Sequence, residues 1–101
     1  MLFNKFGKLK RNKILNMTID QQRKLIEKNK VQYFDILTNS IFTETKILLV
    51  KKLYNLNKLV NDKDYKVRLE IAKLNIDKYN EILLNDVDYH VRIQLAKNNY
   101  K

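Results

Sequence analysis

The sequence predicts an all-α protein in which short helical repeats stack on one another. The chain matches itself at an offset of 24 residues, and each matching segment carries apolar residues at a one-sided helical spacing. The chain of 101 residues is 45% hydrophobic and long enough for one core. We therefore expect a single domain, residues 1–101, with a basic amphipathic segment (1–16), a helical cap or degenerate repeat (17–56) and two repeats (57–101).

The repeat aligns residues 59–75 (LVNDKDYKVRLEIAKLN) with residues 83–99 (LLNDVDYHVRIQLAKNN). Ten of the 17 aligned positions are identical, and four more are conservative exchanges. A period of 24 residues holds one helix of about ten residues, two connections and a second, short element. We expect this second element to be a helix of the tighter 3₁₀ type, capped in the first repeat by Asp77.

The longer helix of each repeat is predicted to begin after Asp64 or Asp88, because an aspartate accepts from free amide donors at a helix N-terminus. The predicted buried stripe consists of Val67, Ile71, Ala72, Val91, Leu95 and Ala96. The two alanines are expected where neighbouring helices approach closely. Asn75 and Asn99 suit the left-handed position that follows a helix.

A carboxylate and a guanidinium recur six residues apart in the two repeats, as Asp62 with Arg68 and Asp86 with Arg92. Each pair can form within its repeat or join one repeat to the next. A capping and stacking network is one interpretation of the two arginines. The other is a polar ridge that contacts a partner.

The pattern L-x-x-D-x-D-x-x-V-R-x-x-x-A-x-x-N over residues 59–99 resembles the leucine-rich repeat variant family, which is similar to HEAT repeats. The resemblance implies a right-handed α-solenoid in which a longer α-helix stacks on a short 3₁₀ helix. It also implies a scaffold that binds proteins or, in basic members, nucleic acid. Ile76 stands where proline often follows the asparagine, and the family's cysteine-rich iron–sulfur segment has no counterpart here.

The first half must supply further helices, because a solenoid normally needs about three units. Thr18 with Gln21 predicts a capping box that opens a helix, and residues 31–37 predict a short one. Shifting back by another 24 residues loses the repeat signature, so residues 43–55 are a degenerate repeat or a capping helix, with Leu53 in its apolar period. In total we expect five or six helical segments.

Positive charge gathers in the first third of the chain. The net charge is +10, and residues 1–30 supply +7 of it, from nine Lys and Arg against two acidic residues. The candidate phosphate contacts are Lys5, Lys8, Lys10, Arg11, Lys13, Arg23, Lys24, Lys28 and Lys30. A/T-rich codon bias is the alternative explanation, because lysine outnumbers arginine 17 to 4.

The basic segment 1–16 has three interpretations. It docks on the body as a cap, it is a disordered arm that folds on a nucleic acid or protein, or it binds a membrane surface.

Catalysis finds little support in the composition. The chain has no cysteine, one glycine and one histidine, which excludes thiolate chemistry and glycine-rich phosphate loops. His90 is expected to face solvent, because Lys66 takes its place in the other repeat. We therefore expect no enzyme, cofactor, metal site or small-molecule substrate. The absence of a long apolar stretch favours a cytoplasmic protein.

Three functions follow as hypotheses. The leading one is a non-catalytic protein that binds another protein, with candidate contacts at Tyr65, Tyr89, Tyr100, Arg68 and Arg92. Size and codon bias fit a phage or mobile-element product, so an inhibitor of a host defence nuclease, such as an anti-CRISPR protein, is one form of it. The second is nucleic-acid binding through the basic third. The third is a homo-oligomer that stacks through residues 97–101.

Overall fold

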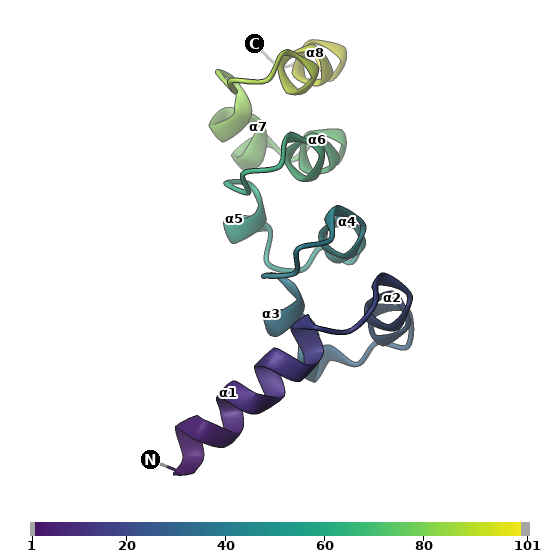
Figure 1. The fold of residues 1–101 in the computed structure, drawn as a ribbon. Helices are drawn as coiled ribbons and strands as arrows, with labels where there is room; N and C mark the ends of the chain where they lie inside the picture. Colours follow the sequence, from purple (N-terminus) through teal and green to yellow (C-terminus); the bar gives the residue numbers. More distant parts are fainter. Residues whose placement is uncertain (1, 100–101) are drawn as a thin grey trace. The chain divides into compact units, whose positions relative to one another are not determined.

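The computed structural model describes the backbone of residues 2–99 and the side chains of residue 7 and residues 9–99. Over residues 2–99 the chain forms eight α-helices and one 3₁₀ helix and contains no strand (Figure 1). The elements are α1 (Leu2–Leu15), α2 (Ile19–Glu27), η1 (Val31–Tyr33), α3 (Phe34–Leu37), α4 (Thr43–Lys51), α5 (Leu56–Leu59), α6 (Tyr65–Lys73), α7 (Asp77–Leu83) and α8 (Tyr89–Lys97). The all-α prediction is confirmed. The expected five or six helical segments are too few, because each short connector between the longer helices is a helix of its own.

The chain divides into two compact units, Met1–Leu49 and Val50–Lys101. In the first unit, α1 contacts α3, and Ile14 near the end of α1 is 5% exposed. Thr18 caps α2 in a full capping box with Gln21, as predicted. The buried hydrophobic side chains of this unit are Ile14, Ile26, Phe34, Leu37 and Leu49.

A polar cluster is buried in the same unit. Gln22 is 0% exposed, and its Oε1 accepts hydrogen bonds from Ser40 Oγ (2.6 Å) and Thr45 Oγ1 (2.9 Å). Its Nε2 donates to the carbonyl of Ile14 at the end of α1 (3.3 Å). Each atom of the buried amide is thereby satisfied, which the low-dielectric interior requires.

In the second unit α6 packs against α8, and α7 contacts both of them. Asp64 and Asp88 are the N-caps of α6 and α8, as predicted. Val67 and Val91 are both fully buried. Asn75 and Asn99 adopt left-handed φ angles of 55° and 59°, which confirms the prediction for both.

Four expectations need correction. The short elements α5 and α7 are α-helices, not 3₁₀ helices. Asp77 is the first residue of α7 and the N-cap is Ile76, so its carboxylate adds negative charge to the first turn and does not cap. Leu53 lies beyond the end of α4, 61% exposed at φ 59°. Ala96 is exposed, because no described helix covers its side of α8.

Candidate functional site

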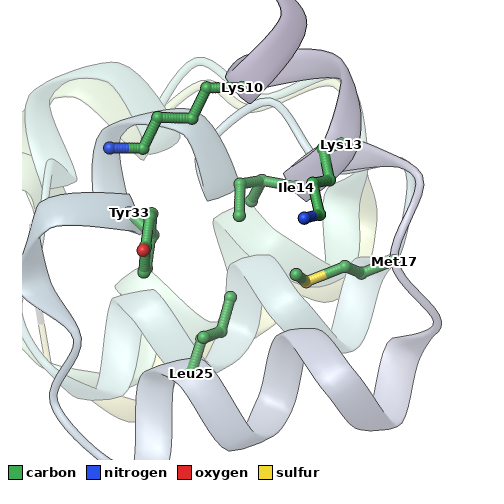
Figure 2. A pocket seen from close by; sticks show the side chains of 6 residues that line it. All are labelled: Lys10, Lys13, Ile14, Met17, Leu25 and Tyr33. Atoms are coloured by element: carbon green, nitrogen blue, oxygen red, sulfur yellow. The ribbon is translucent and has the colours of Figure 1, made fainter.

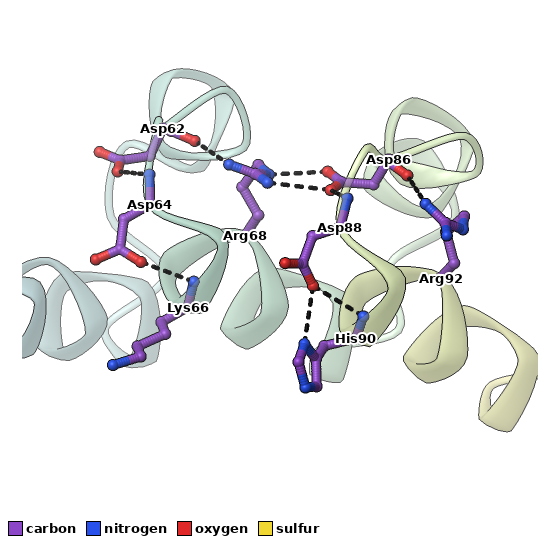
Figure 3. Close-up of polar contacts among 8 residues, drawn as sticks. All are labelled: Asp62, Asp64, Lys66, Arg68, Asp86, Asp88, His90 and Arg92. Carbon is purple, nitrogen blue, oxygen red and sulfur yellow. Dashed lines mark hydrogen bonds and ion pairs between the residues drawn. The ribbon is translucent and has the colours of Figure 1, made fainter.

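Two matching turns open the longer helices of the second unit. In the first, Asp62 Oδ1 accepts from the backbone N–H of Asp64 at 2.9 Å, and Asp64 Oδ1 accepts from that of Lys66 at 2.9 Å. In the second, Asp86 Oδ1 accepts from Asp88 at 2.9 Å, and Asp88 Oδ1 accepts from His90 at 2.8 Å (Figure 3). The first aspartate of each turn fixes the loop and the second caps the helix.

Arg68 joins the two turns. Its Nη1 donates to the backbone carbonyl of Asp62 at 2.7 Å, and its Nε and Nη2 donate to the Asp86 carboxylate at 2.8 and 3.1 Å. The Arg68 side chain is 12% exposed and that of Asp86 is 7% exposed. Hydrogen bonding to Asp86 raises the pKa of Arg68 against the opposing effect of burial. Arg68 therefore forms a structural rung between repeats.

Arg92 repeats one half of this rung. Its Nη1 donates to the backbone carbonyl of Asp86 at 2.6 Å, as Arg68 does to Asp62. The side chain is otherwise exposed, and no second acceptor among the described residues meets the edge that carries Nε and Nη2 (Figure 3). Of the two candidate arginines, only Arg92 therefore offers guanidinium N–H groups to a partner.

The whole side of α8 around Arg92 is open. On α6, Ala72 is fully buried and Leu69 is partly buried. The equivalent residues of α8, Ala96 and Ile93, are exposed, Ile93 to 47%. The same sequence pattern thus gives a covered face on α6 and an open, partly apolar face on α8.

Three rings stack on the surface of the second unit. The ring centroid of His90 lies 4.1 Å from that of Tyr89 and 5.2 Å from that of Tyr65, with interplanar angles of 28° and 19°. Tyr89 is 57% exposed, and His90 faces solvent as predicted. The structure therefore brings two of the candidate protein contacts together, and His90 is the ring that joins them.

Asp88 holds His90 in this position. His90 Nδ1 lies 3.1 Å from Asp88 Oδ1, the same oxygen that caps α8. Desolvation raises the pKa of Asp88, but the backbone and side-chain hydrogen bonds from His90 outweigh it, and the net pKa is lowered. The carboxylate is therefore ionised at neutral pH, beside the stacked rings.

Six candidate phosphate contacts are exposed on the first unit: Lys10, Arg11, Lys13, Lys24, Lys28 and Lys30. Arg23 is half-buried and forms ion pairs with Asp20 and Glu27. The side chains of Lys5 and Lys8 lie outside the described residues, as does Tyr100. The helical α1 continues to Leu15, so segment 1–16 ends inside the first unit at the buried Ile14.

The first unit also has a cavity of about 310 Å³, near the lower limit for small-molecule sites. Its lining residues are Lys10, Lys13, Ile14, Met17, Leu25 and Tyr33 (Figure 2). Lys10 Nζ lies 5.2 Å from the centroid of the Tyr33 ring, a cation–π distance. Flexible lysine and methionine side chains dominate the lining, with no convergent set of fixed polar groups.

Metal ligands and membrane spans were searched over the described residues. They contain no group of three or more His, Asp or Glu side chains placed to hold a metal ion. None of the helices in this part of the chain is long and apolar enough to cross a membrane. No protein-family model, curated protein or solved structure matches the chain.

Sequence reasoning missed two features of these surfaces. His90 was interpreted by itself, although Tyr89 precedes it and the repeat places Tyr65 one unit earlier. The register of the first half was sought at an offset of 24, but the left-handed residues Leu53 and Asn75 lie 22 apart. At this offset, Ser40 corresponds to Asp62.

Proposed function

We propose that the chain is a small non-catalytic helical-repeat protein that binds a protein partner through its second unit. The exposed stack of Tyr65, His90 and Tyr89 carries this proposal. Tyrosine supplies a large contact area at low conformational entropy cost and is enriched at binding hot spots. Stacking fixes the rings before a partner arrives, which lowers the cost of ordering them on binding.

The architecture that we propose for this function is a short right-handed α-solenoid of the leucine-rich repeat variant or HEAT type. Two hydrogen-bonded pairs support it, because each joins residues 18 positions apart in its own unit. Gln22 meets Ser40 in the first unit, and Arg68 meets Asp86 in the second. Residues 17–56 would then be degenerate repeats and not a separate cap.

Affinity capture tests the proposal. The tagged full-length chain is incubated with a lysate of the source cells, with and without nuclease, and compared with Y89A and with I41A. Ile41 is 84% exposed on the first unit and serves as the matched control. We expect a stoichiometric protein that survives nuclease treatment, is retained by I41A and is lost with Y89A. Equal retention by both variants contradicts the proposal.

Binding to a defence nuclease is the form of this function that the anti-CRISPR hypothesis describes. The assay is nuclease cleavage with and without a stoichiometric amount of the chain. Loss of cleavage that Y89A reverses and I41A does not is the expected result for an inhibitor.

Nucleic-acid binding is the second candidate, and the six exposed cations of the first unit favour it. Neutralising about six phosphates gives a log–log salt slope near about −5. The triple variant K10Q/R11Q/K13Q is the suitable probe. Deleting residues 1–16 is not, because it removes the buried Ile14 and the carbonyl that Gln22 binds. A flat salt response excludes this function.

Self-stacking through residues 97–101 is the third candidate. Sedimentation velocity over a concentration series separates it from the other two, because a constant monomer mass excludes it.

A further inference from the structure

We infer that the open edge of Arg92 receives a carboxylate from the partner protein, carried on a turn that opens a helix. This inference rests on the proposed function and names the chemistry of its partner. The chain holds its own template for the contact, since Arg68 binds Asp86 in this way one repeat earlier. Arg92 is therefore the docking residue of an unfilled rung.

The inner half of the rung is already formed. The guanidinium of Arg92 is anchored on the carbonyl of Asp86 at 2.6 Å, just as that of Arg68 is anchored on Asp62 at 2.7 Å. In Arg68 this anchor leaves Nε and Nη2 aimed at a carboxylate, which they bind as a fork. The anchor of Arg92 holds the same two groups ready, so a partner gains the contact at a reduced entropy cost.

The surface around Arg92 suits a helical element. Ile93 and Ala96 lie on the same open side of α8, and their counterparts on α6 are partly or fully covered in the second unit. A helix packed there would meet a small residue, an aliphatic residue and a guanidinium at its N-terminal end. A turn such as Asp86–Asp88 places a carboxylate at that end.

Charge favours an acidic partner over a second copy of the chain. The protein carries a net charge of +10, so two copies repel each other over long range. A partner with surface aspartates or glutamates is attracted, and its carboxylate pairs with a guanidinium that lies in a partly apolar surround. We therefore commit to an acidic protein surface as the occupant.

A lengthened chain tests the geometry. A third copy of residues 76–99 is inserted after Asn99, so that a new aspartate follows Arg92 by the 18 residues that separate Arg68 from Asp86. Urea unfolding is measured for this chain, for R92Q, for the new aspartate changed to asparagine, and for both changes together. K97Q is the matched control, because Lys97 is exposed on α8 about 140° around the helix from Arg92.

We expect R92Q to lower the folding equilibrium constant at least about tenfold in the lengthened chain and to change it little in the natural chain. The two substitutions together should cost clearly less than their sum, and K97Q should change neither chain. Equal effects of R92Q in both chains, or additive effects of the two changes, overturn the inference.

The capture assay gives the second readout, with R92E and K97E. We expect R92E to reduce recovery of the partner at least about tenfold while K97E retains it. If Y89A abolishes capture and R92E does not, the inference fails and the proposed function stands. If no protein is captured at all, the proposed function fails, and the lengthened chain still decides whether Arg92 receives a carboxylate. A dimer that R92E dissolves identifies a second copy as the occupant and overturns the acidic partner.

Discussion

Arg68 and Arg92 occupy the same position in two repeats, yet replacing them by methionine should have very different effects on stability. R68M removes the fork on Asp86 and leaves that carboxylate, 7% exposed, without its counter-ion. R92M removes one hydrogen bond to a backbone carbonyl from an exposed side chain. Methionine keeps most of the aliphatic stem in both variants, so the charge and its hydrogen bonds are the main difference.

The magnitudes follow from burial. Breaking one partner of a buried pair costs about 3–5 kcal/mol, and we take about 3 kcal/mol for R68M because the Arg68 side chain is 12% exposed. An exposed substitution away from such a network stays within about 0.5 kcal/mol, which applies to R92M. At about 4–8 °C per kcal/mol for a domain of this size, Tm should fall by about 12 °C or more in R68M and by about 4 °C or less in R92M.

Thermal unfolding followed by far-ultraviolet circular dichroism measures both values. Adding D86N to R68M should recover part of the loss, because the unpaired charge disappears while the asparagine oxygen still accepts from Asp88. Equal Tm losses in R68M and R92M would refute the reasoning. So would a further loss in the double variant.

Three other matched changes test the packing and the caps. A72L should destabilise by about 1–3 kcal/mol and A96L by little, since Ala72 is 0% exposed and Ala96 is open; urea midpoints decide. L53G should stabilise the chain by about 1 kcal/mol, because leucine holds φ 59° only with strain, and a lower Tm contradicts this. The depressed pKa of Asp88 means that its carboxylate stabilises the fold above the ordinary aspartate pKa of about 3.9, and this contribution is lost as the pH falls through the lower native pKa. In D88N the decline of Tm on acidification should be shallower, and an unchanged decline counts against this cap.

The local features of the second unit were predictable because each depends on a few neighbouring residues. An aspartate before an apolar helical stripe indicates an N-cap, and both Asp64 and Asp88 take that role. An asparagine after the stripe indicates a left-handed residue, which both Asn75 and Asn99 confirm. Alternation of burial along each helix required no knowledge of the tertiary structure.

The partner of Arg68 could not be predicted in the same way. A spacing of six residues from Asp62 allows contact within the repeat and contact with the next repeat. The structure uses both, with a backbone carbonyl on the near side and a carboxylate on the far side. Which contact uses which group depends on the packing of α6 on α8, and the sequence pattern does not specify that distance.

The register of the first half was hidden by a difference in length. Leu53 and Asn75 are 22 residues apart, whereas Asn75 and Asn99 are 24 apart. The short helix between the first two, α5, has 4 residues, and its counterpart α7 has 7. Leucine at a left-handed position also removes the asparagine signal that marks the other repeats. A search at a fixed offset therefore misses the match.

Burial explains why equivalent positions carry different polar groups. Gln22 and Ser40 are 0% and 3% exposed, and an ion pair there would lose nearly all of its hydration. A neutral amide and a hydroxyl satisfy each other at 2.6 Å without that cost. Arg68 keeps 12% of its side chain exposed, and Arg92 is open to solvent. Charge thus occupies these positions only where water still reaches the guanidinium, and the most exposed of them is the one placed to meet a partner.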